Sequence, residues 1–295
     1  MLHDNNSCYN FKKLTFSQGL LDEGVDATYI IHLEGNGRYQ DILNQLENYH
    51  PTKIVYIVFN KGYKNCKKDE NITLPAHDLV DAFLTIFKHA NNPNQNYNNI
   101  LILEDDFIFN EKIKDGTTQK NIKTFLNNHK NDDFEYLLGC MPLIQIPYTL
   151  DCKHYISVAS IGSHACIYSR NNRDELLKKN PETITDWDLY NFLNSRRYTY
   201  YEPLCYQLFP DTDNSNNWHK DNYILHIFAK LTKKILIFLK LDTQIEPGYS
   251  FFYLFSKIFF FILLFIVLFI VFWIIIKFIK NKTKYIKNPG LRNNK

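Results

Sequence analysis

Three acidic side chains follow directly on a run of apolar residues. The run ILIL at residues 100–103 ends in Glu104, Asp105 and Asp106. Such a run is typical of a strand buried on both faces of a sheet, and carboxylates do not stay buried without partners. We therefore expect the acids at the carboxyl edge of an α/β sheet, where such sheets bind ligands. Clustered carboxylates suit Mg²⁺ or Mn²⁺ holding a diphosphate, and a plain acidic turn is the alternative.

The segments before the acids predict a β-α-β-α-β order. Residues 28–33 (TYIIHL) and 53–59 (KIVYIVF) are β-rich, and apolar residues recur between them at helical spacing over residues 42–49. A second helix is expected over residues 76–89, before the acid-tipped strand. This order is typical of a parallel α/β fold. The turn at residues 34–38 (EGNGR) lacks the G-x-G-x-x-G fingerprint of dinucleotide binding.

The composition predicts a well-filled core and no nucleic-acid surface. The 295 residues are 45% hydrophobic and 16% aromatic, with a formal net charge of only +3. Much of the positive charge lies in the last twenty residues, so we expect no nucleic-acid partner. The six cysteines contain no C-x-x-C pair. We expect them to be reduced thiols, neither a zinc site nor a disulfide framework.

One segment is long and apolar enough to cross a membrane. Residues 258–276 (IFFFILLFIVLFIVFWIII) carry no charge, and at about 1.5 Å per residue they span about 28 Å, which matches a bilayer core. The following tail, residues 277–295, is basic and has no acid. Residues 230–240 (KLTKKILIFLK) resemble a helix lying on an anionic membrane face, or they form the last helix of the domain.

Two arguments on membrane orientation conflict. The positive-inside rule would keep the basic tail in the cytosol. The polar residues 1–26, however, contain no run resembling a secretory signal, so we expect a tail anchor with the main domain in the cytosol. The expected organisation is a polar extension (1–26), an α/β domain (27–228), a basic and apolar membrane-proximal segment (229–257), a transmembrane helix (258–276) and a basic tail (277–295).

Four segments, in order, resemble glycosyltransferase family 25, the lipopolysaccharide and procollagen galactosyltransferase-like group. ILEDD at residues 102–106 matches the family's leucine–glutamate–aspartate–aspartate motif. YIIHL at residues 29–33, followed by Arg38, resembles the family's opening strand and arginine. The family usually has Asn at the position of His32.

The other two segments lie on either side of the acids. AHDL at residues 76–79 resembles the family's Ser-His opening of a helix, with Ala76 in place of Ser. Residues 162–207 resemble its distal half through Gly162, Asp186-Trp187 and Gln207. The resemblance covers about residues 27 to 220. It implies a GT-A-like fold with a Rossmann-like mixed sheet that binds a nucleotide diphospho-sugar.

The resemblance also implies roles for the acids. Asp106 would be the direct ligand of Mn²⁺ or Mg²⁺, Asp105 would bind ribose or sugar hydroxyls directly or through the metal, and Glu104 would orient Asp106. The further donor-binding candidates are His32, Arg38 and His77. The structural alternatives are a plain salt bridge for Glu104, a solvated surface arginine for Arg38 and a helix cap for His77.

A late histidine often completes the metal shell in GT-A enzymes. The candidates here are His219, His226 and His164. Inversion at the anomeric carbon needs a general base, and Asp186 and Asp188 are the candidates. Trp187 between them would stack on a sugar face. The alternatives are a helix cap for Asp186 and a core position for Trp187.

We therefore expect a membrane-anchored, metal-dependent, inverting glycosyltransferase. It would move a sugar such as galactose or glucose from a nucleotide sugar, in the first place a UDP-sugar, to a glycan, protein or lipid acceptor. Two other classes stay open. One is a catalytically inactive relative that acts as a membrane-tethered binding or scaffold protein. The other is a different sugar-nucleotide enzyme, such as a nucleotidyltransferase.

Overall fold

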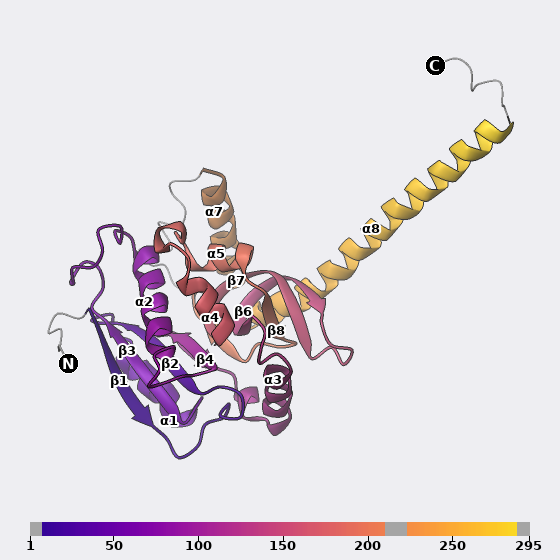
Figure 1. The fold of residues 1–295 in the computed structure, drawn as a ribbon. Helices are drawn as coiled ribbons and strands as arrows, with labels where there is room; N and C mark the ends of the chain where they lie inside the picture. The colour runs from indigo at the N-terminus through magenta and orange to yellow at the C-terminus, as the bar shows by residue number, and fades with distance from the viewer. Residues whose placement is uncertain (1–7, 210–222, 288–295) are drawn as a thin grey trace.

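A mixed sheet of seven strands forms the centre of the chain in the computed structural model, which describes residues 8–209 and 223–287 (Figure 1). The strands are β1 (Tyr9–Thr15), β2 (Ala27–Leu33), β3 (Ile54–Asn60), β4 (Asn99–Glu104), β5 (Phe107–Phe109), β6 (Glu135–Pro147), β7 (His154–Ser169), β8 (Arg197–Tyr200) and β9 (Cys205–Gln207). The sheet order is β1-β3-β2-β4-β7-β6-β8, and β5 pairs with β9 in a separate two-stranded ribbon. The expected α/β class with a mixed sheet is confirmed.

Helices cover both faces of the sheet. They are α1 (Tyr39–Asn48), α2 (Pro75–Ala90), α3 (Gly116–Asn128), α4 (Arg170–Leu177), α5 (Trp187–Asn194), α7 (Tyr223–Phe238) and α8 (Gly248–Lys287), with short 3-10 turns at Glu111–Lys114 and Pro181–Thr183. Successive side chains of a strand point to opposite faces. In β2, Ile30 therefore packs with α1 and α3, while Tyr29 and Ile31 pack with α2, α4 and α5. Both faces of β2 are buried, which is why its sequence is apolar without alternation.

The strand directions bring two loops together. β2 is parallel to both β3 and β4, so these strands end at the same edge of the sheet. Ile31 of β2 lies opposite Glu104, the last residue of β4. The turn that follows β2 and the acids that follow β4 therefore meet at one carboxyl edge.

The N-terminal stretch is part of this sheet, which begins before the expected domain start at residue 27. β1 runs antiparallel to β3, with Tyr9 opposite Asn60. Cys8, directly before β1, forms a disulfide with Cys66 in the loop after β3. The prediction that all six cysteines are reduced thiols is wrong for this pair. Antiparallel pairing places the start of β1 beside the end of β3, and the separation of 58 residues in sequence hides that proximity.

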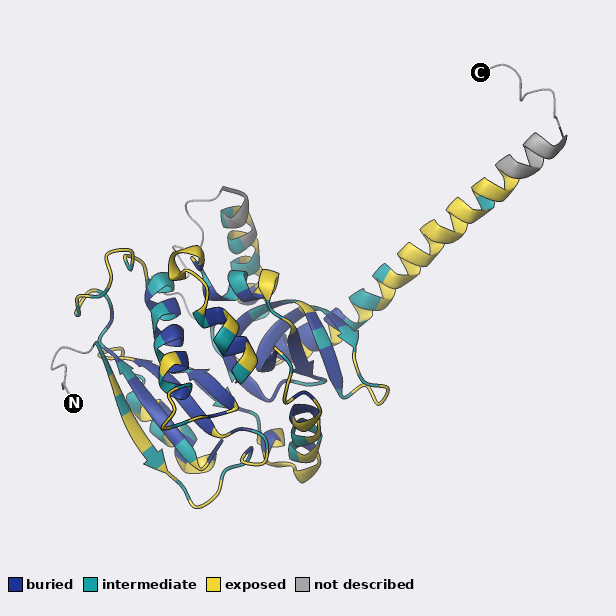
Figure 2. Cartoon of the chain, viewed as in Figure 1, coloured by how far each residue is buried: buried dark blue, intermediate teal, exposed yellow. Residues whose placement is uncertain are grey.

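The C-terminal helix begins inside the domain. Tyr249, Phe252 and Tyr253 in its first turns are buried against Met141 of β6, and Ser256 Oγ donates to the side chain of a buried glutamine of β6 at 2.9 Å. The domain therefore continues beyond its expected end at residue 228. Past these turns the helix is exposed (Figure 2). Its segment Gly248–Lys280 is the one described helix long and apolar enough to cross a membrane.

Arg173 of α4 is the largest fully buried side chain, and its guanidinium holds α4 against the end of α2. It donates to Asn91 Oδ1 at 2.8 Å and to three backbone carbonyls at 2.6 to 3.0 Å. Arg173→Ala should lower the free energy of unfolding by about 3–5 kcal/mol, because it leaves these buried acceptors unpaired and opens a cavity. Denaturation of the full chain in detergent measures the change. Arg170→Ala, at a partly exposed position on the same helix, is the control at about 0–1 kcal/mol, and equal losses would contradict the prediction.

Candidate functional site

Asp105 accepts hydrogen bonds from four donors at the carboxyl edge of the sheet. They are His32 Nδ1 at 3.2 Å, the Leu33 amide at 3.1 Å, Asn36 Nδ2 at 2.5 Å and Arg38 Nη1 at 2.9 Å. Burial by itself would raise the pKa of Asp105, but these donors outweigh it and hold the pKa below its usual range. Asp105 is therefore an ionised anchor that ties the turn after β2 to the end of β4.

The turn after β2 has the backbone shape that this anchoring needs. Gly35 and Gly37 have φ angles of 83° and 82°, in the region that side chains disfavour and glycine adopts freely. Two left-handed residues so close together fold the chain back, and Asn36 and Arg38 thereby reach Asp105. Asn36 is a site residue that the sequence analysis missed. The Gly-Asn-Gly triplet predicts a sharp turn, but the direction of its side chain depends on where β4 ends.

Asp106 has one engaged oxygen and one free one. Its Oδ2 accepts from Arg38 Nη1 at 2.9 Å and from Gln207 Nε2 at 3.0 Å. Its Oδ1 is buried and has no hydrogen-bond partner among the described residues. Burial raises the pKa of Asp106, although the charge of Arg38 opposes the rise. The free oxygen is the atom of this site that is best suited to a cation.

The charge of Asp188, on α5, affects the pKa of an acid at the end of β4. Burial raises the pKa of Glu104 well above its ordinary value, and the charges of Asp106 and Asp188 add to the rise. Burial also raises the pKa of Asp188, with the charge of Asp186 adding to it, while a 2.5 Å hydrogen bond from Ser163 Oγ opposes it. The fold thus brings Asp188 within charge range of the acids that end β4.

Asp186 and Trp187 have structural roles. Asp186 Oδ1 accepts from the Leu189 amide at 2.9 Å and caps the start of α5. Trp187 is 2% exposed. Its ring stacks on Phe83 with centroids 4.3 Å apart, and its Nε1 donates to Tyr168. The cap and core alternatives therefore describe these two residues, and Trp187 is not available to stack on a sugar.

The candidate histidines lie in separate places. His77 Nδ1 is 3.0 Å from the Asn71 carbonyl and ties α2 to the loop before it. His164 is fully buried in β7, where burial lowers its pKa to about 4. His226 lies on α7, and His219 lies outside the described residues. Within residues 8–209 and 223–287, no three His, Cys, Asp or Glu side chains are arranged to hold a metal ion.

These acids suit a metal ion that is bound partly by the protein and partly by a phosphate group. They suit less well a metal ion whose ligands all come from the protein. Mg²⁺ commonly takes one or two carboxylates and completes its shell with water and phosphate oxygens. Asp106, through Oδ1, meets that requirement. Asp105, expected as a second metal ligand, has its oxygens engaged by four donors instead. We therefore retain Asp106 alone as the metal candidate among the described residues.

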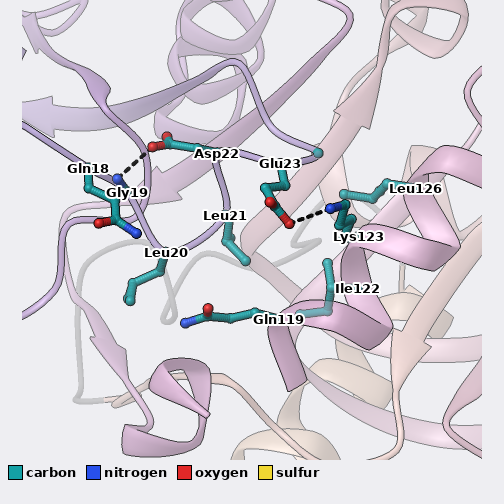
Figure 3. A pocket seen from close by; sticks show the side chains of 11 residues that line it. Gln18, Gly19, Leu20, Leu21, Asp22, Glu23, Gln119, Ile122, Lys123 and Leu126 are labelled. Atoms are coloured by element: carbon teal, nitrogen blue, oxygen red, sulfur yellow. Dashed lines mark hydrogen bonds and ion pairs between the residues drawn. The ribbon is translucent and has the colours of Figure 1, made fainter. Parts of the chain in front are cut away.

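A cavity of about 260 Å³ lies away from these acids (Figure 3). It is lined by residues 18–24, which precede β2, and by one face of α3. Glu23 and Lys123 form an ion pair of 2.6 Å beside it. None of the acids of the candidate site lines this cavity. It belongs to the opposite end of β2.

Comparisons with known proteins give distant similarities. No family model matches the sequence, and no curated protein matches it significantly. Among solved structures, A197 from STIV is 12% identical with a TM-score of 0.36, over 62% of this chain and 85% of that one. A glycosyltransferase involved in the glycosylation of the major capsid of PBCV-1 is 12% identical with a TM-score of 0.35, over 63% and 95%. Membership of family 25 is not shown, and neither structure, at this similarity, assigns an activity to the chain.

Proposed function

We propose that this chain is a membrane-anchored glycosyltransferase of the GT-A type. It would transfer a hexose from a nucleotide sugar, in the first place a UDP-sugar, to a glycan, protein or lipid acceptor. One observation carries the proposal: Asp105, Asp106 and Arg38 meet at the carboxyl edge of β2 and β4. Open α/β sheets bind nucleotides at such an edge. The resemblance of ILEDD to the family 25 motif supports it.

The residues of this edge would divide the work of binding the donor. Arg38 Nη1 is 2.9 Å from both Asp105 and Asp106, and its planar guanidinium would turn towards the phosphate oxygens of the donor. Asp105 would keep the turn after β2 in place. Asp106 Oδ1 would hold Mn²⁺ or Mg²⁺, which when bound neutralises charge on a departing diphosphate.

Asp188 is our candidate for the general base that removes the proton of the acceptor hydroxyl. A base must be ionised, and burial raises the pKa of Asp188. Transfer should therefore be lost, as the pH falls, at a pH above the ordinary aspartate pKa of about 3.9. Asp188→Asn should lower kcat by about 10²–10⁴-fold with donor binding retained. The pH profile of kcat/KM measures the loss of transfer at low pH. Single-turnover assays measure the effect of Asp188→Asn on the rate of transfer.

The matched control for this prediction is Asp186→Asn. Asparagine caps a helix as well as aspartate does, so the variant should keep both its stability and its transfer activity. If Asp186→Asn abolishes transfer while Asp188→Asn does not, the base is assigned to the wrong aspartate.

The class of enzyme is tested with the full chain in detergent. Release of nucleoside diphosphate is followed from a panel of nucleotide sugars, with and without Mn²⁺. Release from a single donor that requires metal is the expected result. Release of pyrophosphate when the protein is given a nucleoside triphosphate together with a sugar phosphate would instead indicate a nucleotidyltransferase. Failure to bind any donor would favour the second candidate, an inactive binding protein. One observation favours the inactive binding protein: Arg38 and Gln207 occupy Asp106 Oδ2, so this oxygen is not open to a metal ion.

Two features favour placing the domain outside the cytosol, against the tail-anchored placement that the N-terminal residues suggest. Disulfides such as Cys8–Cys66 persist in oxidising compartments, and the positive-inside rule would keep the basic tail on the cytosolic side. Cys152 is the exposed free cysteine. In sealed vesicles with the cytosolic face outward, a membrane-impermeant maleimide should label Cys152 only after detergent is added. Labelling of intact vesicles would place the domain in the cytosol, and Cys152→Ser controls for labelling elsewhere.

A further inference from the structure

Tyr249 connects the base of the apolar helix α8 to the ribbon strand β9. Its hydroxyl accepts from the Gln207 amide at 2.9 Å and donates to the Gln207 carbonyl at 3.1 Å. The side chain is fully buried, and its ring lies edge-on to those of Tyr206 and His164. One hydroxyl thus holds both backbone polar groups of a single residue.

Gln207 is the second donor, beside Arg38, to one oxygen of Asp106. Its Nε2 donates to Asp106 Oδ2 at 3.0 Å. Its backbone lies opposite Phe107, the residue that directly follows Asp106, in the β5–β9 pairing. The position of the Gln207 main chain therefore decides whether its side-chain amide reaches Asp106, and Tyr249 fixes that main chain together with the β5–β9 pairing.

We propose that Tyr249 is a positioning residue of the donor site: through Gln207 it holds Asp106 so that Oδ1 is left open to a ligand. This inference rests on the proposed function. Arg38 and Gln207 both donate to Oδ2. The second oxygen, which is buried and has no partner in the part of the chain that the structure describes, is then the one presented to a cation or a donor hydroxyl. The membrane helix is thus part of the site as well as its anchor.

The first turns of α8 are anchored to the domain by further hydrogen bonds. Ser256 Oγ donates to Gln145 Oε1 at 2.9 Å, and Lys257 Nζ donates to the Tyr201 carbonyl at 2.5 Å. Tyr249 precedes the uncharged segment at residue 258 by nine residues, which is about 14 Å of helix. If the uncharged segment marks the hydrocarbon core, the residue that holds Gln207 would lie about 14 Å along the helix from the start of that core.

The test uses the full chain in lipid nanodiscs and measures binding of UDP and of GDP, each with Mn²⁺, by calorimetry. Tyr249→Phe removes only the hydroxyl and should weaken binding of the preferred diphosphate about tenfold, the usual scale for leaving buried hydrogen-bonding groups unpaired. Tyr253→Phe is the matched control. It lies on the same helix and is buried as well, and among the described residues its hydroxyl has one hydrogen-bond partner, Cys140 Sγ at 3.9 Å. Its binding should stay within about twofold of wild type.

A double substitution separates positioning from general packing. If Tyr249 acts through Gln207, Tyr249→Phe should cause no further loss of binding in a Gln207→Ala background. Additive losses, or binding by Tyr249→Phe equal to wild type, would overturn the inference while the proposed function stands. If the wild-type chain binds neither diphosphate, the proposed function falls and the inference falls with it. Thermal unfolding of each variant shows whether a loss of binding reflects loss of folding.

Discussion

Asp106→Ala should lower nucleoside diphosphate release by about a thousandfold, the scale on which enzymes lose rate when a group that stabilises developing charge is removed. The reason lies in the contacts of this carboxylate. Within residues 8–209 and 223–287, Asp106 Oδ1 is buried without a hydrogen-bond partner, and Oδ2 accepts from Arg38 and Gln207. The substitution removes the candidate cation ligand and also frees the two donors that frame it.

The fold should survive this substitution. Burial raises the pKa of Asp106, which means that ionised Asp106 is less stable in the folded chain than in water. Its removal should therefore leave the free energy of unfolding unchanged or slightly higher at neutral pH. Donor release and thermal unfolding are measured side by side, with Glu23→Ala, an exposed acid at the opposite end of β2, as the control. Unchanged donor release by a folded Asp106→Ala protein would refute the assignment of this site.

A chain that ends at residue 228 should not fold. It lacks Tyr249, Phe252 and Tyr253, whose side chains are at most 5% exposed and cover Met141 of β6. Burying one large apolar side chain contributes about 1.5–3 kcal/mol, so the three together contribute roughly 5–9 kcal/mol. That is comparable with the whole stability of a typical domain, about 5–15 kcal/mol.

A chain that ends at Lys257 is the matched comparison. It keeps every described residue of α8 that is buried and omits the uncharged segment 258–276. We expect this longer fragment to give a cooperative thermal transition and dispersed amide resonances, and the shorter one to give neither. A fragment 8–228 that melts at the same temperature as 8–257 would show that α8 is only an anchor.

Local patterns in the sequence predict much of the sheet and its acid-tipped edge. A strand buried on both faces must be apolar at consecutive positions, and β2, β3 and β4 have such runs. Carboxylates that follow one of these strands must reach solvent or partners. That reasoning places Asp105 and Asp106 correctly at the end of β4. It does not say which donors they meet, because Asn36 comes from the turn after β2 and Gln207 from the distant strand β9.

Other features of the site depend on strand order. Asp188 comes within charge range of Glu104 because α5 packs against β7 on the same face of the sheet as α2. Trp187 is the reverse case: a tryptophan between two aspartates suggests a sugar platform, but the packing of α5 on α2 puts it against Phe83. In a helix of only eight residues, the sequence pattern does not distinguish the buried face from the exposed one. Packing against the neighbouring elements decides which face is buried.

By itself, the sequence determined the features that follow from residues adjacent in the chain. These are the buried strands, the acids at their edge, the glycine turn before Arg38 and the long uncharged segment of α8. The tertiary structure alone decided which distant residues meet: Cys8 with Cys66, Asn36 with Asp105, and Tyr249 with Gln207. The physical reason is the distance along the chain over which each feature is determined. Side-chain period and apolar length are set within a few residues, whereas these contacts depend on how strands far apart in the chain pair within one sheet.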